Sequence, residues 1–201
     1  GFEIDKFKFD LMARIRIRKE LELREEDTII ITVGRWDVQK DYYTLLKALN
    51  ELKKHNSKFK MIMVGTNLDY SNNTLVSLIN DYSLKDNIIL LGRRNDIPVL
   101  LSAADIYISS SLGESFSNAI GEAMACELPC IVTDVGDSKL IVGDTGKVVE
   151  AKDYKSMSKE LLNYTNSHIL NRNKNARRRV IDNYEITVVS KIFEETFERI
   201  G

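Results

Sequence analysis

The sequence contains little cysteine and little proline, and it has no long hydrophobic segment. Its only cysteines are Cys126 and Cys130, too few for a disulfide framework, so we expect a reduced, cytoplasmic setting. Its only prolines are Pro98 and Pro129, which leaves no proline-rich linker. No apolar run approaches the ~18 residues of a membrane span. The net charge is −1, which argues against nucleic acid as a partner, because proteins that bind it are strongly basic.

Several nucleotide- and metal-binding motifs are also absent. The sequence has neither the G-x-G-x-x-G fingerprint of dinucleotide-binding proteins nor the G-x-x-x-x-G-K-[ST] loop of P-loop NTPases. It has no Asp-x-Asp pair, and His55 and His168 are isolated. Cys126 and Cys130 are separated by a strand-initiating proline, so we interpret them as small core residues. The sequence therefore predicts no metal site.

What the sequence does contain is an alternation of two kinds of segment. Short runs rich in β-branched residues are typical of buried parallel strands; they lie at 28–34, 59–65, 87–92, 105–110, 129–133 and 146–150. Helical segments precede, separate and follow them, at 13–23, 41–55, 72–83, 96–102, 116–126, 153–165, 168–182 and 185–199. This alternation predicts an α/β fold, a Rossmann-like doubly wound parallel sheet of about six strands rather than a closed barrel of eight.

The length predicts a single domain over residues 1–201. Within it, residues 1–26 form a linker-like start with a short helix, residues 27–165 the Rossmann-like core, and residues 166–201 the C-terminal helices. The chain begins with Gly1 rather than Met. We therefore expect it to be part of a longer protein.

Ligands of such sheets bind at the carboxyl ends of the strands, and the loop after the fourth strand is the most informative. Its small residues run into a helix whose first N–H groups are free beside Gly113, Ser115 and Ser117, which favours an anion such as phosphate. Glu114 and Glu122 flank this position. Carboxylates there suit sugar hydroxyls, which donate hydrogen bonds to them. The alternative is that Glu114 is a helix cap and Glu122 a solvated helix residue.

Basic residues occur at two places of interest. Arg35 and Lys40 follow the first strand, and at the carboxyl edge of the sheet they are candidate cations for the same anion; the alternative is that both are solvated. A second group is typical of a solvated helix face, with contact to anionic lipid as the alternative: Arg172, Lys174, Arg177, Arg178 and Arg179.

Five motifs in order together resemble one known family. Residues 114–125 (ESFSNAIGEAMA) resemble the E-x7-E signature of retaining glycosyltransferases of the GT-B fold, glycosyltransferase family 4. Val33, Gly34 and Arg35 with Lys40 resemble the family's first glycine–arginine loop. Residues 92–98 resemble its base-side loop, and residues 133–136 and 143–146 its later turns. The opening residues 1–7 resemble the segment that begins the second domain of these enzymes.

The resemblance implies the C-terminal, donor-binding half of a GT-B fold. In this family, residues at the positions of Arg35 and Lys40 hold the donor diphosphate, next to Gly34. Glu114 would lie near the donor sugar, and Glu122 would accept the ribose hydroxyls. The backbone of the four residues that begin with Ser115 would help to bind phosphate (Ser115, Phe116, Ser117 and Asn118). The base would lie by Arg93 and Arg94.

The sequence departs from the family pattern at three points. Asp41 follows Lys40 where many members have glycine, and Ser115 also stands where glycine is common. Lys139 and Leu140 occupy a stretch where a glutamate often follows the turn. These departures bear on the donor sugar more than on the nucleotide.

The expected function is therefore metal-independent, retaining hexosyl transfer from a nucleotide-sugar, UDP-linked by expectation, with no further cofactor. The acceptor would be a glycan or a polyprenyl-linked sugar in surface polysaccharide biosynthesis. An N-terminal acceptor domain, absent from this chain, would bind it, so the chain alone is expected to be inactive in transfer. We expect a cytoplasmic enzyme, with peripheral contact at the inner face of the membrane as an option. The alternatives are a non-catalytic nucleotide-binding or partner-docking module and a GT-B related epimerase.

Overall fold

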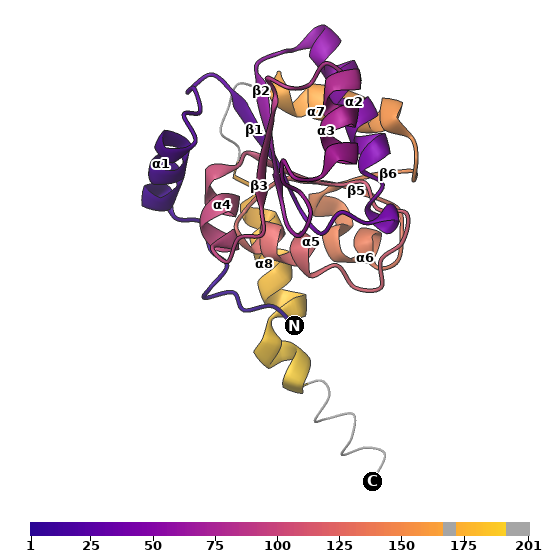
Figure 1. Ribbon diagram of the computed structural model, residues 1–201. Coiled ribbons are helices and arrows are strands. Elements are labelled where there is room, and N and C mark those ends of the chain that lie inside the picture. The colour runs from indigo at the N-terminus through magenta and orange to yellow at the C-terminus, as the bar shows by residue number, and fades with distance from the viewer. Residues whose placement is uncertain (167–171, 192–201) are drawn as a thin grey trace.

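The computed structural model describes residues 1–166 and 172–191, which form one six-stranded parallel sheet covered by helices on both faces (Figure 1). The sheet order is β3-β2-β1-β4-β5-β6. The strands are β1 Thr28–Val33, β2 Phe59–Val64, β3 Ile88–Gly92, β4 Ile106–Ser109, β5 Cys130–Thr133 and β6 Lys147–Val149. The helices are α1 Leu11–Glu20, α2 Tyr42–His55, α3 Asn73–Asp81, α4 Ile97–Ala103, α5 Asn118–Ala125, α6 Ser138–Val142, α7 Tyr154–Thr165 and α8 Lys174–Tyr184.

Alternate residues of each strand supply two separate cores. In β1, Ile29 and Ile31 face the core formed with α4, α5 and α8, whereas Ile30 faces the core formed with α2, α3 and α7. All three isoleucines are fully buried. Because a strand alternates its side chains between the two faces, burial on both faces requires the continuous apolar run found in the sequence. The predicted doubly wound sheet is confirmed.

The strand order reverses next to β1, which has β2 on one side and β4 on the other. The loops that follow β1 and β4 leave the sheet at the same carboxyl edge and are neighbours there. In open parallel sheets such a switch point is where ligands bind. The fold therefore places the two loops singled out in the sequence next to each other.

Several element boundaries differ from the prediction. The helix expected from residue 116 begins at Asn118, and the helix expected at 13–23 is α1, Leu11–Glu20. Three short elements were not predicted, namely α6, Ser138–Val142, and the 3-10 helices Val38–Lys40 and Gly143–Thr145. The helix expected from residue 168 begins at Lys174, with residues 167–171 outside the described part. Residues 186–191 are helical as expected, and the rest of the segment expected at 185–199 lies outside the described residues.

The late basic group is not the solvated helix face that the sequence predicts. Arg172 donates to the carbonyls of Ser102 and Ala104, and it lies 3.9 Å from the ring centroid of Phe9. Burial lowers the pKa of Arg172 to about 10. Arg177 and Arg179 likewise donate to backbone carbonyls, and only Lys174 and Arg178 are solvated as expected. The guanidinium forks offer several donors to backbone carbonyls, so these arginines tie the C-terminal helix to the core.

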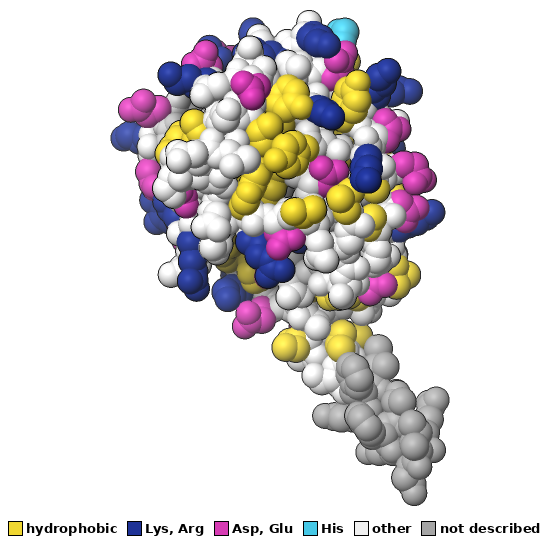
Figure 2. All heavy atoms as spheres, turned by 45° about the vertical axis from the view of Figure 1, so that its right-hand side comes forward, with side chains coloured by type: hydrophobic (Ala, Val, Ile, Leu, Met, Phe, Trp, Pro, Cys, Tyr) yellow, Lys and Arg dark blue, Asp and Glu magenta, His cyan; other side chains and the backbone are white. Residues whose placement is uncertain are grey.

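Charges of both signs lie on the face of the molecule seen in Figure 2. Figure 2 shows Lys and Arg interspersed with Asp and Glu on the visible face, around a central group of hydrophobic side chains. Among residues 1–166 and 172–191, no helix is long and apolar enough to cross a membrane.

Asp41 explains one departure from the family pattern and generates a stability prediction. Its φ of 43° lies in the left-handed region, and its side chain accepts a hydrogen bond from Thr44 N at 3.2 Å, capping α2. Aspartate tolerates this conformation better than most residues and adds a cap that glycine cannot. We expect Asp41→Ala to lower the free energy of unfolding by about 1–2 kcal/mol, measured by urea denaturation.

Asp41→Gly is the matched control for this prediction. Glycine loses the cap but adopts a positive φ freely, so Asp41→Gly should cost less than Asp41→Ala. Equal losses for the two variants would show that the left-handed backbone contributes nothing to the effect.

Candidate functional site

The centre of the candidate site is an ion pair between the loops after β1 and β4. Lys40 Nζ pairs with a carboxylate oxygen of Glu114, and Ser111 Oγ donates to that same oxygen at 2.7 Å. The side chains of Lys40 and Glu114 are 25% and 12% exposed. Each charge is therefore partly removed from water and compensated by the other, as a partly buried ion pair must be.

Backbone contacts join the same two loops. Leu112 N donates to the carbonyl of Gln39 at 2.7 Å, and Ser110 Oγ donates to the carbonyl of Lys40 at 2.7 Å. No motif in the sequence assigns a role to Ser110 or Ser111. The sequence shows only three consecutive serines at the carboxyl end of a strand. Serines are also common in turns that have no functional role, so this pattern does not identify a site.

Two glycines let the neighbouring loops approach this closely. A β-carbon on Gly65 would lie 1.7 Å from the carbonyl oxygen of Gly34, and one on Gly136 would lie 1.8 Å from the carbonyl oxygen of Glu114. Both glycines also have positive φ. No side chain fits at either place, so glycine is required for the contact. The loops after β1, β4 and β5 thereby converge at one edge.

The segment before α5 carries a row of unpaired backbone donors. None of the N–H groups of residues 113–117 donates a hydrogen bond within the described part of the chain. Ser117 is the N-cap of α5, and its side chain makes no cap hydrogen bond. Ser115, Phe116 and Asn118 are exposed. Free N–H groups at a helix N-terminus, with its positive dipole end, suit an anion.

Glu122 lies one turn into α5 and differs from Glu114 in having no partner. Its side chain is half-buried, and it forms no hydrogen bond or ion pair with the described residues. Burial raises the pKa of Glu122, while the charge of Lys6 acts in the opposite direction. A desolvated carboxylate without a partner destabilises the folded domain, and such groups are concentrated at functional sites.

The remaining predicted cations are engaged elsewhere or exposed. Arg35 is 69% exposed and pairs with Asp37 at 3.1 Å, so the structure does not bring it against Lys40 or Glu114. Arg94 makes a bidentate pair with Asp96, which raises the pKa of Arg94. Arg93 is exposed. The predicted roles of these three arginines at a nucleotide remain predictions.

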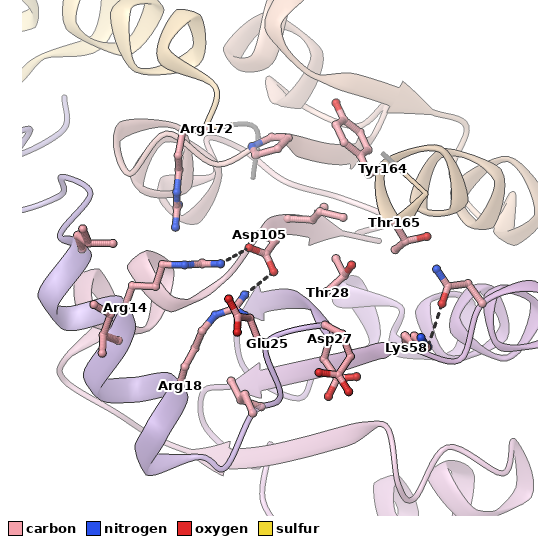
Figure 3. A pocket seen from close by; sticks show the side chains of 17 residues that line it. Arg14, Arg18, Glu25, Asp27, Thr28, Lys58, Asp105, Tyr164, Thr165 and Arg172 are labelled. Carbon is pink, nitrogen blue, oxygen red and sulfur yellow. Dashed lines mark hydrogen bonds and ion pairs between the residues drawn. The ribbon is translucent and has the colours of Figure 1, made fainter. Parts of the chain in front are cut away.

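A cavity of about 690 Å³ lies at the opposite, amino edge of the sheet, among the residues that begin β1, β4 and β5 (Figure 3). Arg14 and Arg18 of α1 point at Asp105 there and bind it at 2.7 and 2.6 Å. Asp105 also accepts the N–H of Ile29 at 2.7 Å. Arg14 and Arg18 further donate to the carbonyls at the end of α4. Asp105 is thus satisfied by two arginines and a backbone N–H, which stabilises the fold. Nothing in the sequence pattern predicts this network.

Both cysteines are buried and unpaired, as predicted. Burial raises the pKa of the Cys126 thiol to about 12. Among the described residues, no group of three His, Cys, Asp or Glu side chains is placed to hold a metal ion.

Comparisons with known proteins show the family and the fold of the chain. The family model described as "Glycosyl transferases group 1" matches residues 13–184. The chain is 30% identical over 196 residues to the Escherichia coli UDP-Gal:alpha-D-GlcNAc-diphosphoundecaprenol alpha-1,3-galactosyltransferase, covering 92% of this chain and 49% of that protein. The chain spans about half the length of the curated relatives it matches.

Solved structures show the same fold. Anabaena HepE in complex with UDP and glucose matches with a TM-score of 0.88 at 22% identity, over 99% of this chain and 55% of that one. The C-terminal domain of a group 1 glycosyl transferase (LpcC) from Francisella tularensis matches with a TM-score of 0.77 at 22% identity, over 92% of this chain and 100% of that one. The fold is therefore the C-terminal, Rossmann-like half of the GT-B architecture.

The partner-free Glu122 generates a prediction on pH and stability. The pKa of Glu122 is higher in the folded than in the unfolded chain. The folded state is therefore favoured by protonated Glu122 at low pH, and this contribution to the free energy of unfolding is lost as the pH rises through the folded-state pKa. Glu122→Gln removes the buried charge. We expect this variant to have a higher Tm than the parent at pH 7.5 and a smaller advantage at pH 4, by circular dichroism.

Glu25→Gln, at an exposed position, is the control for loss of a surface carboxylate. A Glu122→Gln variant with a lower Tm than the parent at pH 7.5 would mean that the carboxylate is already well satisfied.

Proposed function

Since the chain belongs to the group 1 glycosyl transferases, we propose that it is the donor-binding half of a retaining, metal-independent enzyme that uses a UDP-linked sugar. The observation that carries the proposal is the Lys40–Glu114 ion pair beside the unpaired N–H groups of residues 113–117. This arrangement places a cation, a carboxylate and a row of N–H donors together at the carboxyl edge. The cation and the N–H groups suit the diphosphate of a nucleotide-sugar, and the carboxylate suits its hydroxyl groups.

The diphosphate would be held by Lys40 and by the N–H groups before α5. Charge-assisted hydrogen bonds from an ammonium and from a helix N-terminus are strong in a partly dry site. The same groups would stabilise the negative charge that develops on the leaving diphosphate, a role that a bound cation has in other transferases. Arg35, exposed in the adjacent loop, would reach the phosphates by leaving Asp37.

The sugar and the nucleoside would be recognised by the carboxylates and the base-side loop. Glu122, half-buried and partner-free, would accept the ribose hydroxyls, and Glu114 would lie near the transferred sugar while orienting Lys40. Arg93 and Arg94 would border the base. The HepE structures with UDP support the choice of nucleotide, because they share this fold.

The acceptor is proposed from the relatives. The E. coli relative acts on a sugar linked to diphosphoundecaprenol, and a Campylobacter jejuni relative has a diphospho-undecaprenol acceptor in its name. We infer a glycan or polyprenyl-linked acceptor, as in surface polysaccharide synthesis, bound by a second domain. A cytoplasmic enzyme in peripheral contact with the membrane would suit such an acceptor.

The first test of this proposal is nucleotide binding without metal. We expect calorimetry with UDP to show saturable binding that chelator leaves unchanged. Lys40→Ala should weaken binding by roughly tenfold or more, because a hydrogen bond to a charged group contributes about 1.5–3 kcal/mol. The control is Lys47→Ala, at an exposed position on α2. Loss of binding in chelator would reject the metal-free site.

The second test separates transfer from binding. We expect the 201-residue chain to bind a UDP-sugar but not to transfer the sugar to added lipid-linked acceptors in a radiolabel assay, because orientation of the acceptor contributes about 7–11 kcal/mol to catalysis. In the full-length protein, Glu122→Ala should raise the donor KM, while Glu114→Ala should mainly lower kcat.

Three outcomes of these assays would contradict the proposal. Robust transfer by the chain alone would show that no second domain is needed. Saturable UDP binding with no transfer by the full-length protein would favour a non-catalytic module. Interconversion of UDP-sugars by the full-length protein would favour an epimerase.

A further inference from the structure

Phe2 is a buried aromatic residue that reaches the candidate site from the far end of the sequence. Its side chain is 3% exposed. Its ring stacks on that of Phe116, with centroids 5.4 Å apart and 18° between the planes. Tyr184, at the end of α8, meets both rings edge-on or tilted at 6.2 Å. The three rings connect the opening segment, the loop before α5 and the C-terminal helix.

The backbone fixes the place of Phe2. Its N–H donates to the carbonyl of Tyr184 at 2.7 Å, and its carbonyl accepts from the N–H of Ile186 at 3.2 Å. These two bonds form a parallel bridge with Glu185. The ring is thus held by a hydrogen-bonded segment and serves as a firm support for what lies on it.

Phe2 also packs directly against α5. A β-carbon on Gly121 would lie 2.0 Å from the Phe2 ring, so the helix presents bare backbone to the ring at this turn. Glu122, the proposed ribose ligand, is the next residue. The ring of Phe2 therefore touches the site at two places, through Phe116 before the helix and through Gly121 within it.

Few contacts besides these hold the 113–117 loop, which Gly136 also approaches closely at the carbonyl oxygen of Glu114. The N–H groups of residues 113–117 make no hydrogen bond within the described residues. The loop is anchored on one side by Glu114, through Lys40 and Ser111. On its other side the anchor is Phe116, whose described ring partners are Phe2 and Tyr184. If the N–H groups are kept free for an anion, side chains must position the loop instead.

We propose that Phe2 is a positioning residue of the donor site, which holds the 113–117 loop and α5 in the geometry that binds the nucleotide. This inference rests on the proposed function of the site. Phe2 touches no phosphate or sugar; it acts through Phe116 and Gly121. Aromatic pairs contribute through their ring geometry beyond the area they bury, so a side chain of similar volume without a ring should not replace it.

The test measures UDP affinity by calorimetry on the 201-residue chain. Phe2→Leu keeps most of the volume and removes the stack, and we expect at least fivefold weaker binding. Phe7→Leu is the control, because Phe7 lies in the same opening segment and the same core and is similarly buried. It should bind UDP within twofold of the parent. All variants are compared at a temperature at which circular dichroism shows them folded.

Two further variants connect the effect to the proposed contacts. Phe116→Leu should weaken binding about as much as Phe2→Leu, and the double variant should be little worse than either, because residues that act through one contact are non-additive. Gly121→Ala leaves the ring intact and displaces it, so it should also weaken binding.

The outcomes distinguish this inference from the function on which it rests. If the parent chain fails to bind UDP, the proposed function is wrong. If the parent binds and Phe2→Leu binds within twofold of it, or Phe7→Leu loses as much affinity as Phe2→Leu, the positioning role of Phe2 is wrong. Additive effects of Phe2→Leu and Phe116→Leu would likewise show that the stack does not carry the effect.

Discussion

The ion pair between Lys40 and Glu114 exists because the strand order reverses at β1. The two residues are 74 positions apart, and they meet only because β1 and β4 are neighbours in the sheet. The pair also reduces an electrostatic cost. The charge of Lys40, the proposed phosphate ligand, would be left uncompensated in a partly buried place, and Glu114 compensates it. The serine and glycine contacts of three loops then fit around this pair.

Other polar groups at the same edge are left unsatisfied. Glu122 is a half-buried carboxylate without a partner, and five consecutive N–H groups before α5 have none among the described residues. Five helices have a side-chain cap, from Asp10, Asp41, Asn72, Asp153 and Asn173, which accept from the first turns; α5, like α4 and α6, has none. Unsatisfied donors and acceptors gathered at one edge are what a polar ligand can complete. The unsatisfied groups at the carboxyl edge thus lower the stability of the domain, and packing in the rest of the fold offsets this loss.

At the amino edge of the sheet, by contrast, the main buried carboxylate is paired. Arg14 and Arg18 converge on Asp105, and together with Arg172 they donate to the carbonyls around the end of α4. Cations at a helix C-terminus interact favourably with its dipole and satisfy carbonyls that have no intrahelical partner. This edge holds a sizeable cavity, and its central carboxylate, Asp105, is already paired with two arginines. Beside it, Nε of the buried Arg172 guanidinium has no hydrogen-bond partner among the described residues.

The sequence by itself determined the six strands and their parallel arrangement, and it predicts the carboxyl edge as the place where a ligand binds. Apolar runs and helical periodicity report which side chains face a core, and that is a local property. It also singled out Lys40, Glu114 and Glu122, because they stand directly after or near the ends of strands. Which partner each polar side chain takes was decided only by the tertiary structure. Contacts such as Arg177 with Ala125 or Phe2 with Phe116 join segments more than 50 residues apart. Such contacts depend on how the helices pack across the sheet. The hydrophobic periodicity of a segment shows which of its faces is buried, but it does not show which distant segment covers that face.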